Sequence, residues 1–489
     1  MLFNSLDFAI FFPIVFILYW IVSKNLTLRN GLLLVSSYVF YGWWDWRFLF
    51  LIAFSSIVDF IVGQKLYKEE NKTKRKRYLM TSLFVNLGLL VYFKYTNFFI
   101  ETFVDSFRLF GKELEVSTLN IILPVGISFY TFQTLSYTID IYRKQLEPTK
   151  DWLSFFAFVS FFPQLVAGPI ERASHLLPQF YKTYKFNYNQ VKSGLLLIAL
   201  GLFKKMVIAD RTAILVNQVY SNPSEYQGID IIVATVFFAF QIYCDFSGYS
   251  DIAIGTARTM GFDLMKNFDS PYLSKSITEF WRRWHISLST WFRDYVYIPL
   301  GGSRNGKYRT YANLFIVFLT SGLWHGAAMT FVIWGGIHGF IIVFEKAITK
   351  QRENLYKNLN VKKDSTIRRV VFIPVVFFIV CFAWVFFRAN NLTDALILIS
   401  NINFNNLSNL TNGKIYKLGL IKPEFMVALI AIFLLTLFEW FNKKYNFQLR
   451  LSKQILPIRW SFYLVVFFII IVFGIYGDDQ VAEFIYFKF

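Results

Sequence analysis

The sequence predicts an all-α protein that crosses a membrane many times, and three observations support this prediction. Of the 489 residues, 55% are hydrophobic and 20% are aromatic. Only 17% are charged, compared with roughly 25% in soluble globular proteins. The mean hydropathy is +0.44. A chain this long and this apolar has too little polar surface to cover itself in water, so a soluble domain and a disordered chain are both excluded.

Apolar runs predict about 11–12 transmembrane helices, because roughly 20 residues of helix span a hydrocarbon core of about 30 Å. The runs lie near residues 6–22, 30–45, 47–64, 78–100, 120–142, 192–209, 230–257, 311–328, 330–346, 370–388, 424–441 and 460–476. The first run lacks the basic leader and cleavage site of a signal peptide, so we expect a retained helix. In the run 152–168, Pro163 and the pair Gly168-Pro169 predict a re-entrant or broken helix.

The charge pattern predicts the orientation of these helices. Fifty Lys and Arg against 31 Asp and Glu give a formal charge of +19. The basic residues gather in the short loops 64–77, 346–369 and 442–459. Cytoplasmic loops are enriched in this way, so the charge predicts no nucleic-acid partner. The loops 101–119 and 389–413 are expected on the opposite side, with the N-terminus outside and residues 258–309 in the cytoplasm.

We expect one integral membrane domain over residues 1–489, since neither a repeat nor a soluble domain is evident. Its largest polar insertion, 258–309, carries His285, and the core helices of 310–347 carry His325.

The sequence offers no familiar metal or phosphate motif. Its two cysteines, Cys244 and Cys381, lie in apolar stretches, which excludes a disulfide framework and a cysteine-ligated zinc site. An inert buried thiol is expected at Cys244 rather than an acyl carrier, because no histidine or lysine is adjacent. Phosphate-binding and dinucleotide-binding glycine loops and a hydrolase nucleophile elbow are absent from the sequence.

Within the cytoplasmic insertion, residues 279–295 predict an amphipathic helix. An arc of about 120° holds Trp281, Trp284, His285, Leu288, Trp291, Phe292 and Tyr295. Such a helix lies along the membrane surface or docks onto the bundle from the cytoplasm. His285 is a titratable ring in the middle of this apolar stripe, where it is either a hydrogen-bonded core residue or a functional one.

Two further histidines, His325 and His338, fall at membrane depth, where ionisable residues raise a functional hypothesis. Burial favours neutral imidazole, which accepts a proton. Thirteen residues of helix separate the two by roughly 220° and about 20 Å, and neither has a ligand at i+3 or i+4, so no metal site is expected. The small residues near His325 allow either close helix packing or a narrow channel: Ser321, Gly322, Gly326, Ala327 and Ala328.

The remaining polar clusters are less specific. Asp245 and Asp251, in CDFSGYSD, are expected either to pair at the end of a span or to line a cavity. His175 follows GPIER in a polar stretch, and no other feature of the sequence assigns it a function.

Several motifs in order resemble the membrane-bound O-acyltransferase (MBOAT) family, in particular its bacterial branch of alginate O-acetylation. They are EFWRRWHISLSTWFRDYVYIPLGGSR, SGLWHG followed by WGGIHG, CDFSGYSD, FPQLVAGPIER and the terminal FIYFKF. The resemblance runs over essentially the whole chain, including WDWRF at 44–48. It implies a helical bundle around a central tunnel in the bacterial cytoplasmic membrane, with acyl donor and acceptor entering from opposite faces.

The resemblance also implies residue roles. His325 of SGLWHG would be the catalytic histidine, and His285 of RRWH the second polar residue of the site. Trp324 and Ser321 are candidate donors to an oxyanion. Four basic residues either attract the phosphates of coenzyme A or belong to the positive cytoplasmic surface: Arg282, Arg283, Lys275 and Arg304.

The implied function is transfer of an acyl group, expected to be acetyl, from acetyl-CoA or another acyl thioester to a polysaccharide outside the membrane. The thioester is a substrate and no permanent cofactor is implied. A separate extracytoplasmic O-acetyltransferase would complete the modification. Two alternatives are a transporter or flippase of a glycan or lipid intermediate and a non-catalytic scaffold of an envelope complex. Paired charges near the midplane would favour a transporter, whereas the candidates here are mostly histidines and a few lysines such as Lys94.

Overall fold

The computed structural model describes residues 1–108, 119, 121–166, 168–360, 362, 365–404, 406–445, 450–451, 453–477 and 484–487. Parts of the predicted loops 101–119, 346–369, 389–413 and 442–459 lie outside these residues, as do the last two residues of the terminal FIYFKF motif.

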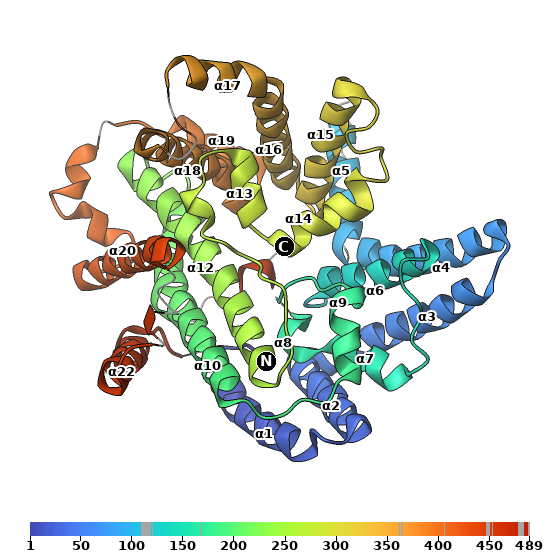
Figure 1. Ribbon diagram of the computed structural model, residues 1–489. Coiled ribbons are helices and arrows are strands. Elements are labelled where there is room, and N and C mark those ends of the chain that lie inside the picture. The colour runs from blue at the N-terminus through green and yellow to red at the C-terminus, as the bar shows by residue number, and fades with distance from the viewer. Residues whose placement is uncertain are drawn as a thin grey trace. The chain divides into compact units, whose positions relative to one another are not determined.

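The described residues form helices and connecting loops, and no β-strand occurs among them, which confirms the predicted all-α membrane fold (Figure 1). In the first half of the chain the helices are α1 Leu6–Val22, α2 Leu26–Asp45, α3 Leu49–Lys68, α4 Lys72–Leu90, α5 Thr96–Arg108, α6 Ile127–Tyr142, α7 Trp152–Ser160, α8 Phe162–Leu165, α9 Ala173–Leu176, α10 Tyr188–Leu202 and α11 Asp210–Ser221. In the second half they are α12 Ile229–Thr259, α13 Ile277–Arg283, α14 Ile286–Phe292, α15 Gly306–His325, α16 Met329–Ala347, α17 Thr349–Asn358, α18 Thr366–Arg388, α19 Leu392–Ser400, α20 Lys422–Tyr445 and α22 Leu456–Phe473.

Seven described helical segments are long and apolar enough to cross a membrane. They are Leu26–Lys68, Lys72–Val104, Ile229–Thr259, Met329–Ala347, Thr366–Arg388, Lys422–Tyr445 and Leu456–Phe473. The count of 11–12 from the sequence differs because it divided Leu26–Lys68 at the turn Trp46–Phe48 and included 6–22, 120–142, 192–209 and 311–328. The helices in these four runs are shorter or more polar; α6, for example, begins only at Ile127.

The chain divides into two compact units, Met1–Ile198 with Ser250–Met265, and Ala199–Tyr249 with Lys266–Phe489. The single domain over 1–489 stays a prediction that this division does not test. Both histidines proposed for catalysis belong to the second unit.

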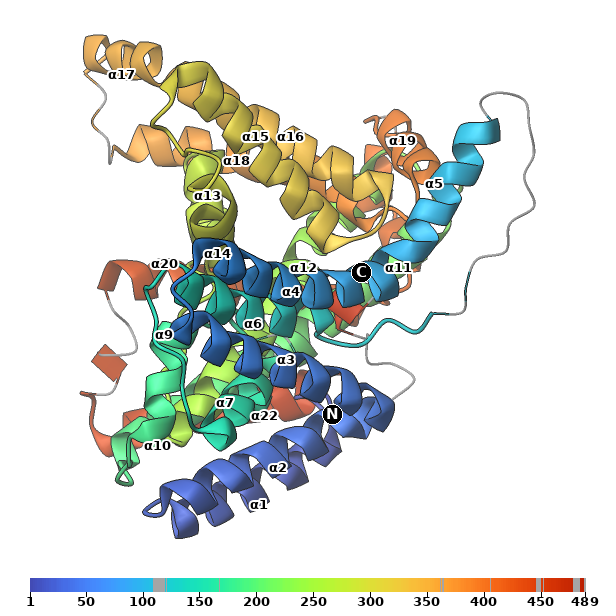
Figure 2. The same ribbon diagram turned by 90° about the vertical axis from the view of Figure 1, so that its right-hand side faces the viewer.

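In the first unit, helices α1 to α4 lie side by side, and α6 packs on α3 and α4 (Figure 2). A buried polar cluster joins α3, α4 and α6. Asp59 of α3 accepts hydrogen bonds from Ser82 and Asn86 of α4 and from Thr138 of α6. The predicted interruption of the run 152–168 is present, because α7 ends at Ser160 and α8 begins at Phe162, with Pro163 in its first turn. Proline fits this position since its missing N–H would be unpaired there anyway.

In the second unit, α15 and α16 form a tight antiparallel hairpin, and α18 and α13 pack on α16 (Figure 2). A Cβ added to Gly322 would lie 2.3 Å from the carbonyl oxygen of Phe331, and one on Gly326 would lie 2.0 Å from Cε2 of the Phe331 ring. These glycines therefore allow close helix packing. Of the two roles expected for the small residues near His325, packing or a narrow channel, packing is the one observed at Gly322 and Gly326.

The prediction of one continuous helix over 279–295 is wrong. Helix α13 ends at Arg283, and α14 begins at Ile286 after His285, whose backbone is left-handed at φ 43° and ψ 56° (Figure 1). The backbone groups at the break pair with an earlier segment: the Asp269 N–H donates to the Arg283 carbonyl, and the Ile286 N–H donates to the Asn267 carbonyl, both at 2.9 Å. Long-range hydrogen bonds thus replace those of a continuous helix.

Candidate active site

His325 is the last residue of α15 and lies almost completely buried, at 2% exposure. Four aromatic rings surround its imidazole. Their centroids lie 4.8 Å away for Trp324, 5.0 Å for Trp334, 5.4 Å for Phe387 and 5.6 Å for Tyr486. These rings come from α15, α16, α18 and the C-terminal segment 484–487.

His285 is fully buried at the break between α13 and α14. Its Nδ1 lies 3.1 Å from Oδ1 of Asn267, and the same oxygen accepts hydrogen bonds from the backbone N–H and the hydroxyl of Ser287. Because a backbone N–H only donates, the Asn267 atom must be the oxygen, and His285 must donate from Nδ1. The neutral ring then has its lone pair on Nε2. Burial lowers the pKa of His285 to about 3, so the ring is uncharged at neutral pH.

The structure brings the two histidines to one aromatic cluster. The Trp324 ring lies 6.0 Å from His285 as well as 4.8 Å from His325. The Tyr486 ring bridges them in the same way, at 6.4 Å and 5.6 Å. The two histidines are 40 positions apart in the sequence, and both contact the same two rings. Both histidine side chains therefore belong to one aromatic cluster.

The C-terminal segment is held beside the histidines by a buried ion cluster. The Ile485 N–H donates to Oδ2 of Asp245 at 2.8 Å, and Nζ of Lys205 lies 2.8 Å from both Asp245 and Asp210. These three charged side chains are at most 3% exposed. Of the two interpretations that the sequence left open for Asp245, pairing is the one observed. Burial raises the pKa of Tyr486, the next residue, and keeps its phenol protonated.

His338 lies one helical turn from Trp334 on α16 and is fully buried. The indole Nε1–H of Trp281 donates to its Nδ1 at 3.2 Å. His338 also belongs to the second unit. Its ring centroid lies 5.1 Å from that of Trp334, whose ring also contacts His325.

The other predicted site residues are placed less centrally. Ser321 is buried one turn before His325, at 6% exposure. Arg283 pairs with Glu279 on α13 and donates to the Leu273 carbonyl, so its charge is engaged within the fold. Arg282 and Arg304 are exposed, and Lys275 is partly exposed. No three His, Cys, Asp or Glu side chains of the described residues form a group that could hold a metal ion.

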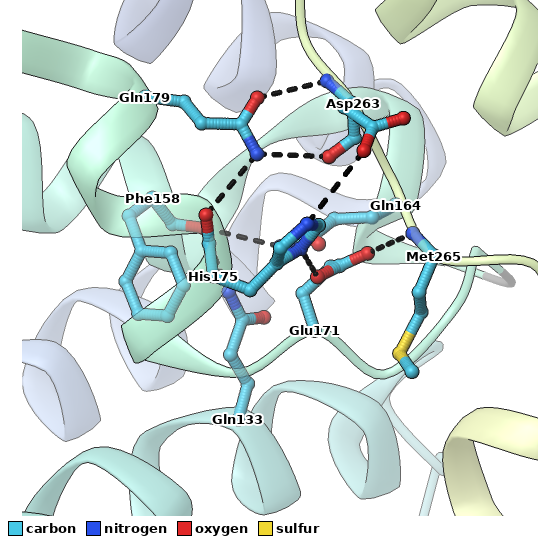
Figure 3. Close-up of polar contacts among 8 residues, drawn as sticks. All are labelled: Gln133, Phe158, Gln164, Glu171, His175, Gln179, Asp263 and Met265. Carbon is cyan, nitrogen blue, oxygen red and sulfur yellow. Dashed lines mark hydrogen bonds and ion pairs between the residues drawn. The ribbon is translucent and has the colours of Figure 1, made fainter.

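His175 and Asp251 belong to the first unit rather than to the histidine cluster. Figure 3 shows His175 between two carboxylates, with Nδ1 at 2.7 Å from Glu171 and Nε2 at 3.7 Å from Asp263. The hydrogen bond to Glu171 raises the pKa of this exposed imidazole. Glu171 also accepts from the Met265 N–H at 2.6 Å. The cluster ties the stretch around 171–179 to 263–265, which is a structural role.

Sequence reasoning missed two residues of the site, Asn267 and Tyr486. Asn267 lies in an irregular loop 18 positions before His285, and no helical or strand periodicity marks it. Tyr486 lies in FIYFKF, which served only as part of the family resemblance. The signal available for Asn267 was its polar side chain, which lies in the same polar insertion as His285.

Comparison with known proteins shows the family of this chain. The model of the membrane-bound O-acyltransferase family, MBOAT, matches residues 148–392, which include His285, His325 and His338. The chain is 41% identical over 398 residues to the probable alginate O-acetylase AlgI of Pseudomonas aeruginosa, covering 81% of this chain and 73% of that protein.

The names of two further relatives specify other polymers. The peptidoglycan O-acetyltransferase of Helicobacter pylori is 36% identical over 439 residues, covering 83% of this chain and 81% of that protein. The teichoic acid D-alanyltransferase of Bacillus subtilis is 28% identical over 286 residues, covering 55% of this chain and 69% of that protein.

Proposed function

The chain belongs to the membrane-bound O-acyltransferase family and is a membrane O-acyltransferase, and from this premise we propose its reaction. It transfers an acetyl group from a cytoplasmic thioester, acetyl-CoA, toward hydroxyls of an extracytoplasmic polysaccharide, with His325 as general base. The host membrane is the bacterial cytoplasmic membrane. As an acyltransferase, the protein is not the non-catalytic scaffold considered as an alternative.

The observation that supports this proposal best is the shared contact of Trp324 and Tyr486 with both histidine rings. His325 takes the proton of the acceptor hydroxyl while the oxygen attacks the thioester carbonyl. The tetrahedral intermediate then collapses, the carbon–sulfur bond breaks, and the imidazolium returns the proton to the leaving thiolate. General base catalysis of this kind contributes roughly 10² to 10⁴-fold.

The neighbouring residues receive supporting roles in the proposal. His285 accepts at Nε2 a hydrogen bond from a second, neighbouring hydroxyl of the acceptor sugar and so orients the reacting hydroxyl for attack. The Trp324 indole and the Ser321 hydroxyl are the proposed donors to the oxyanion. Arg282, exposed at the end of α13, is the proposed contact for the phosphates of coenzyme A. Lys275 and Arg304 of the same polar insertion are further candidates, and Arg283 has a weaker role because Glu279 pairs with it.

The names of the relatives support the proposed class of acceptor. Their names specify alginate, peptidoglycan and teichoic acid, all polymers outside the cytoplasmic membrane. We therefore propose an envelope polysaccharide as acceptor. The separate extracytoplasmic O-acetyltransferase proposed as partner rests on the family resemblance.

The direct test of function is a mass spectrum of envelope glycans from cells with and without the gene. We expect acetyl substituents, each replacing a hydroxyl hydrogen for a net gain of C2H2O, to disappear with the gene and return on complementation. An unchanged set of glycan masses would contradict the proposal.

Asn267 is expected to fix the tautomer and the orientation of the His285 ring. Asn267→Ala should lower kcat roughly tenfold, because the ring loses the acceptor that fixes its tautomer and orientation. His285→Ala should cause a similar loss. Rates of glycan acetylation in membranes measure both.

Asn267→Asp is the control for a merely structural role, since Asp keeps an acceptor for His285 and Ser287. A carboxylate raises the pKa of the imidazole, so the acid limb of kcat/KM should move to higher pH. An unshifted profile would leave Asn267 with a structural role only.

The proposed topology is tested by labelling at the N-cap of α4. A cysteine introduced as Asn71→Cys is exposed, in a loop of the predicted cytoplasmic side. We expect a membrane-impermeant maleimide to label it only in inside-out vesicles. Labelling in intact spheroplasts would invert the scheme.

A further inference from the structure

Three polar side chains form a line along the buried face of α16. Thr330, Trp334 and His338 occupy positions i, i+4 and i+8, so they share one side of the helix. Their exposures are 2%, 0% and 0%. Each has a polar atom, namely Oγ1, Nε1 and Nε2, for which no described residue offers a hydrogen-bond partner. We call this set the α16 stripe.

The chemical character of two of these atoms is fixed. An indole nitrogen only donates, so Trp334 Nε1 is a donor. Because the Trp281 indole donates to Nδ1 of His338 at 3.2 Å, that nitrogen accepts, and the neutral ring must have its proton on Nε2. With the Thr330 hydroxyl, the α16 stripe therefore offers three donors, spaced about 6 Å apart along the helix axis.

Three unsatisfied donors on one buried face are unusual, because most buried polar groups in proteins have a partner. The stripe also adjoins the proposed reaction centre: the Trp334 ring lies 5.0 Å from His325 and 5.1 Å from His338. From there, α16 continues to Lys346 and the basic stretch 346–369, which the charge pattern places in the cytoplasm.

We propose that the α16 stripe binds the amide-bearing arm of the acyl-thioester donor and positions it against His325. This inference rests on the proposed function. The pantetheine arm of an acyl thioester has a thioester carbonyl followed by two amide carbonyls along one flexible chain. Three acceptors in a row complement three donors in a row, and the cytoplasmic end of α16 is the end from which this donor arrives.

Direct binding of a nonreactive donor analogue tests the proposal without relying on turnover. The probe is 2-oxopropyl-CoA, which keeps the pantetheine arm and a carbonyl but has no thioester to transfer. The variants Thr330→Val, Trp334→Phe and His338→Leu each remove one donor. We expect each to raise the Kd for the analogue roughly three- to tenfold in purified full-length protein.

Matched variants separate hydrogen bonding from packing. Thr330→Ser keeps the hydroxyl, and His338→Gln keeps an N–H donor, so both should bind the analogue within about twofold of wild type. In acetyl-CoA kinetics, the donor-removing variants should raise the KM for acetyl-CoA and leave the KM for the glycan unchanged.

The outcomes distinguish this inference from the proposed function. If the wild-type protein binds the analogue and every variant binds it with the same Kd, the role of the α16 stripe is overturned, while the proposed function is not affected. A rise in the glycan KM rather than the acetyl-CoA KM also overturns it, since the stripe would then serve the acceptor. Wild-type protein that does not bind the analogue instead contradicts the coenzyme A thioester as donor, and with it the proposed function.

Discussion

Replacing His325 by alanine is expected to abolish glycan acetylation while leaving the amount of protein in the membrane unchanged. The imidazole is the proposed base, and losing general base catalysis costs roughly 10² to 10⁴-fold in rate. The ring is 2% exposed and contacts Trp324, Trp334, Phe387 and Tyr486. His325→Phe fills the same space without a basic nitrogen and should be equally inactive, which separates chemistry from packing.

The matched control is the histidine of the first unit. His175→Ala removes an exposed imidazole that pairs with Glu171 and Asp263 and has no part in the proposed chemistry. We expect its acetylation rate, normalised to protein amount, to equal that of wild type. Acetylation that persists in His325→Ala and His325→Phe would remove His325 from the mechanism.

Lys205→Met is expected to have the largest effect on stability. Lys205 pairs with Asp210 and Asp245 at 2.8 Å each, and these side chains are at most 3% exposed. Removing one partner of a buried ion pair costs about 3–5 kcal/mol, because the remaining charges stay buried without compensation. The yield of monodisperse protein in detergent and its thermal unfolding midpoint should both fall.

A compensated variant provides the control. Lys205→Met combined with Asp210→Asn and Asp245→Asn leaves no buried charge, so its unfolding midpoint should return most of the way to the wild-type value. A single variant Lys205→Met as stable as wild type would contradict this account of the cluster. Because Asp245 also accepts the Ile485 N–H beside Tyr486, we expect reduced acetylation in any variant that loses this carboxylate.

The fold class was predictable because membrane helices are encoded locally, in runs of apolar residues. The broken helix near Pro163 was predictable for the same reason, since a proline acts on its own turn. His325 and His285 were identified as candidates because titratable side chains at membrane depth and on an apolar stripe stand out from their neighbours.

The break at His285 was not predictable from periodicity. Residues 279–295 have a helical pattern, and the observed burial of Trp284, Leu288 and Trp291 follows it. The break arises from hydrogen bonds to residues 267 and 269, which a local pattern does not contain. The same limit explains why Tyr486 was missed: its place beside His325 depends on Asp245, about 240 residues earlier.

The central claim is that a cytoplasmic thioester and an exported hydroxyl react at His325, and vectorial labelling tests it most directly. Membrane vesicles of both orientations, containing the acceptor glycan and partner proteins, receive radioactive acetyl-CoA from outside. The account predicts labelled glycan in inside-out vesicles, little in right-side-out vesicles, and none in either from His325→Ala cells. Equal labelling in both orientations, or labelling in the His325→Ala vesicles, would contradict it.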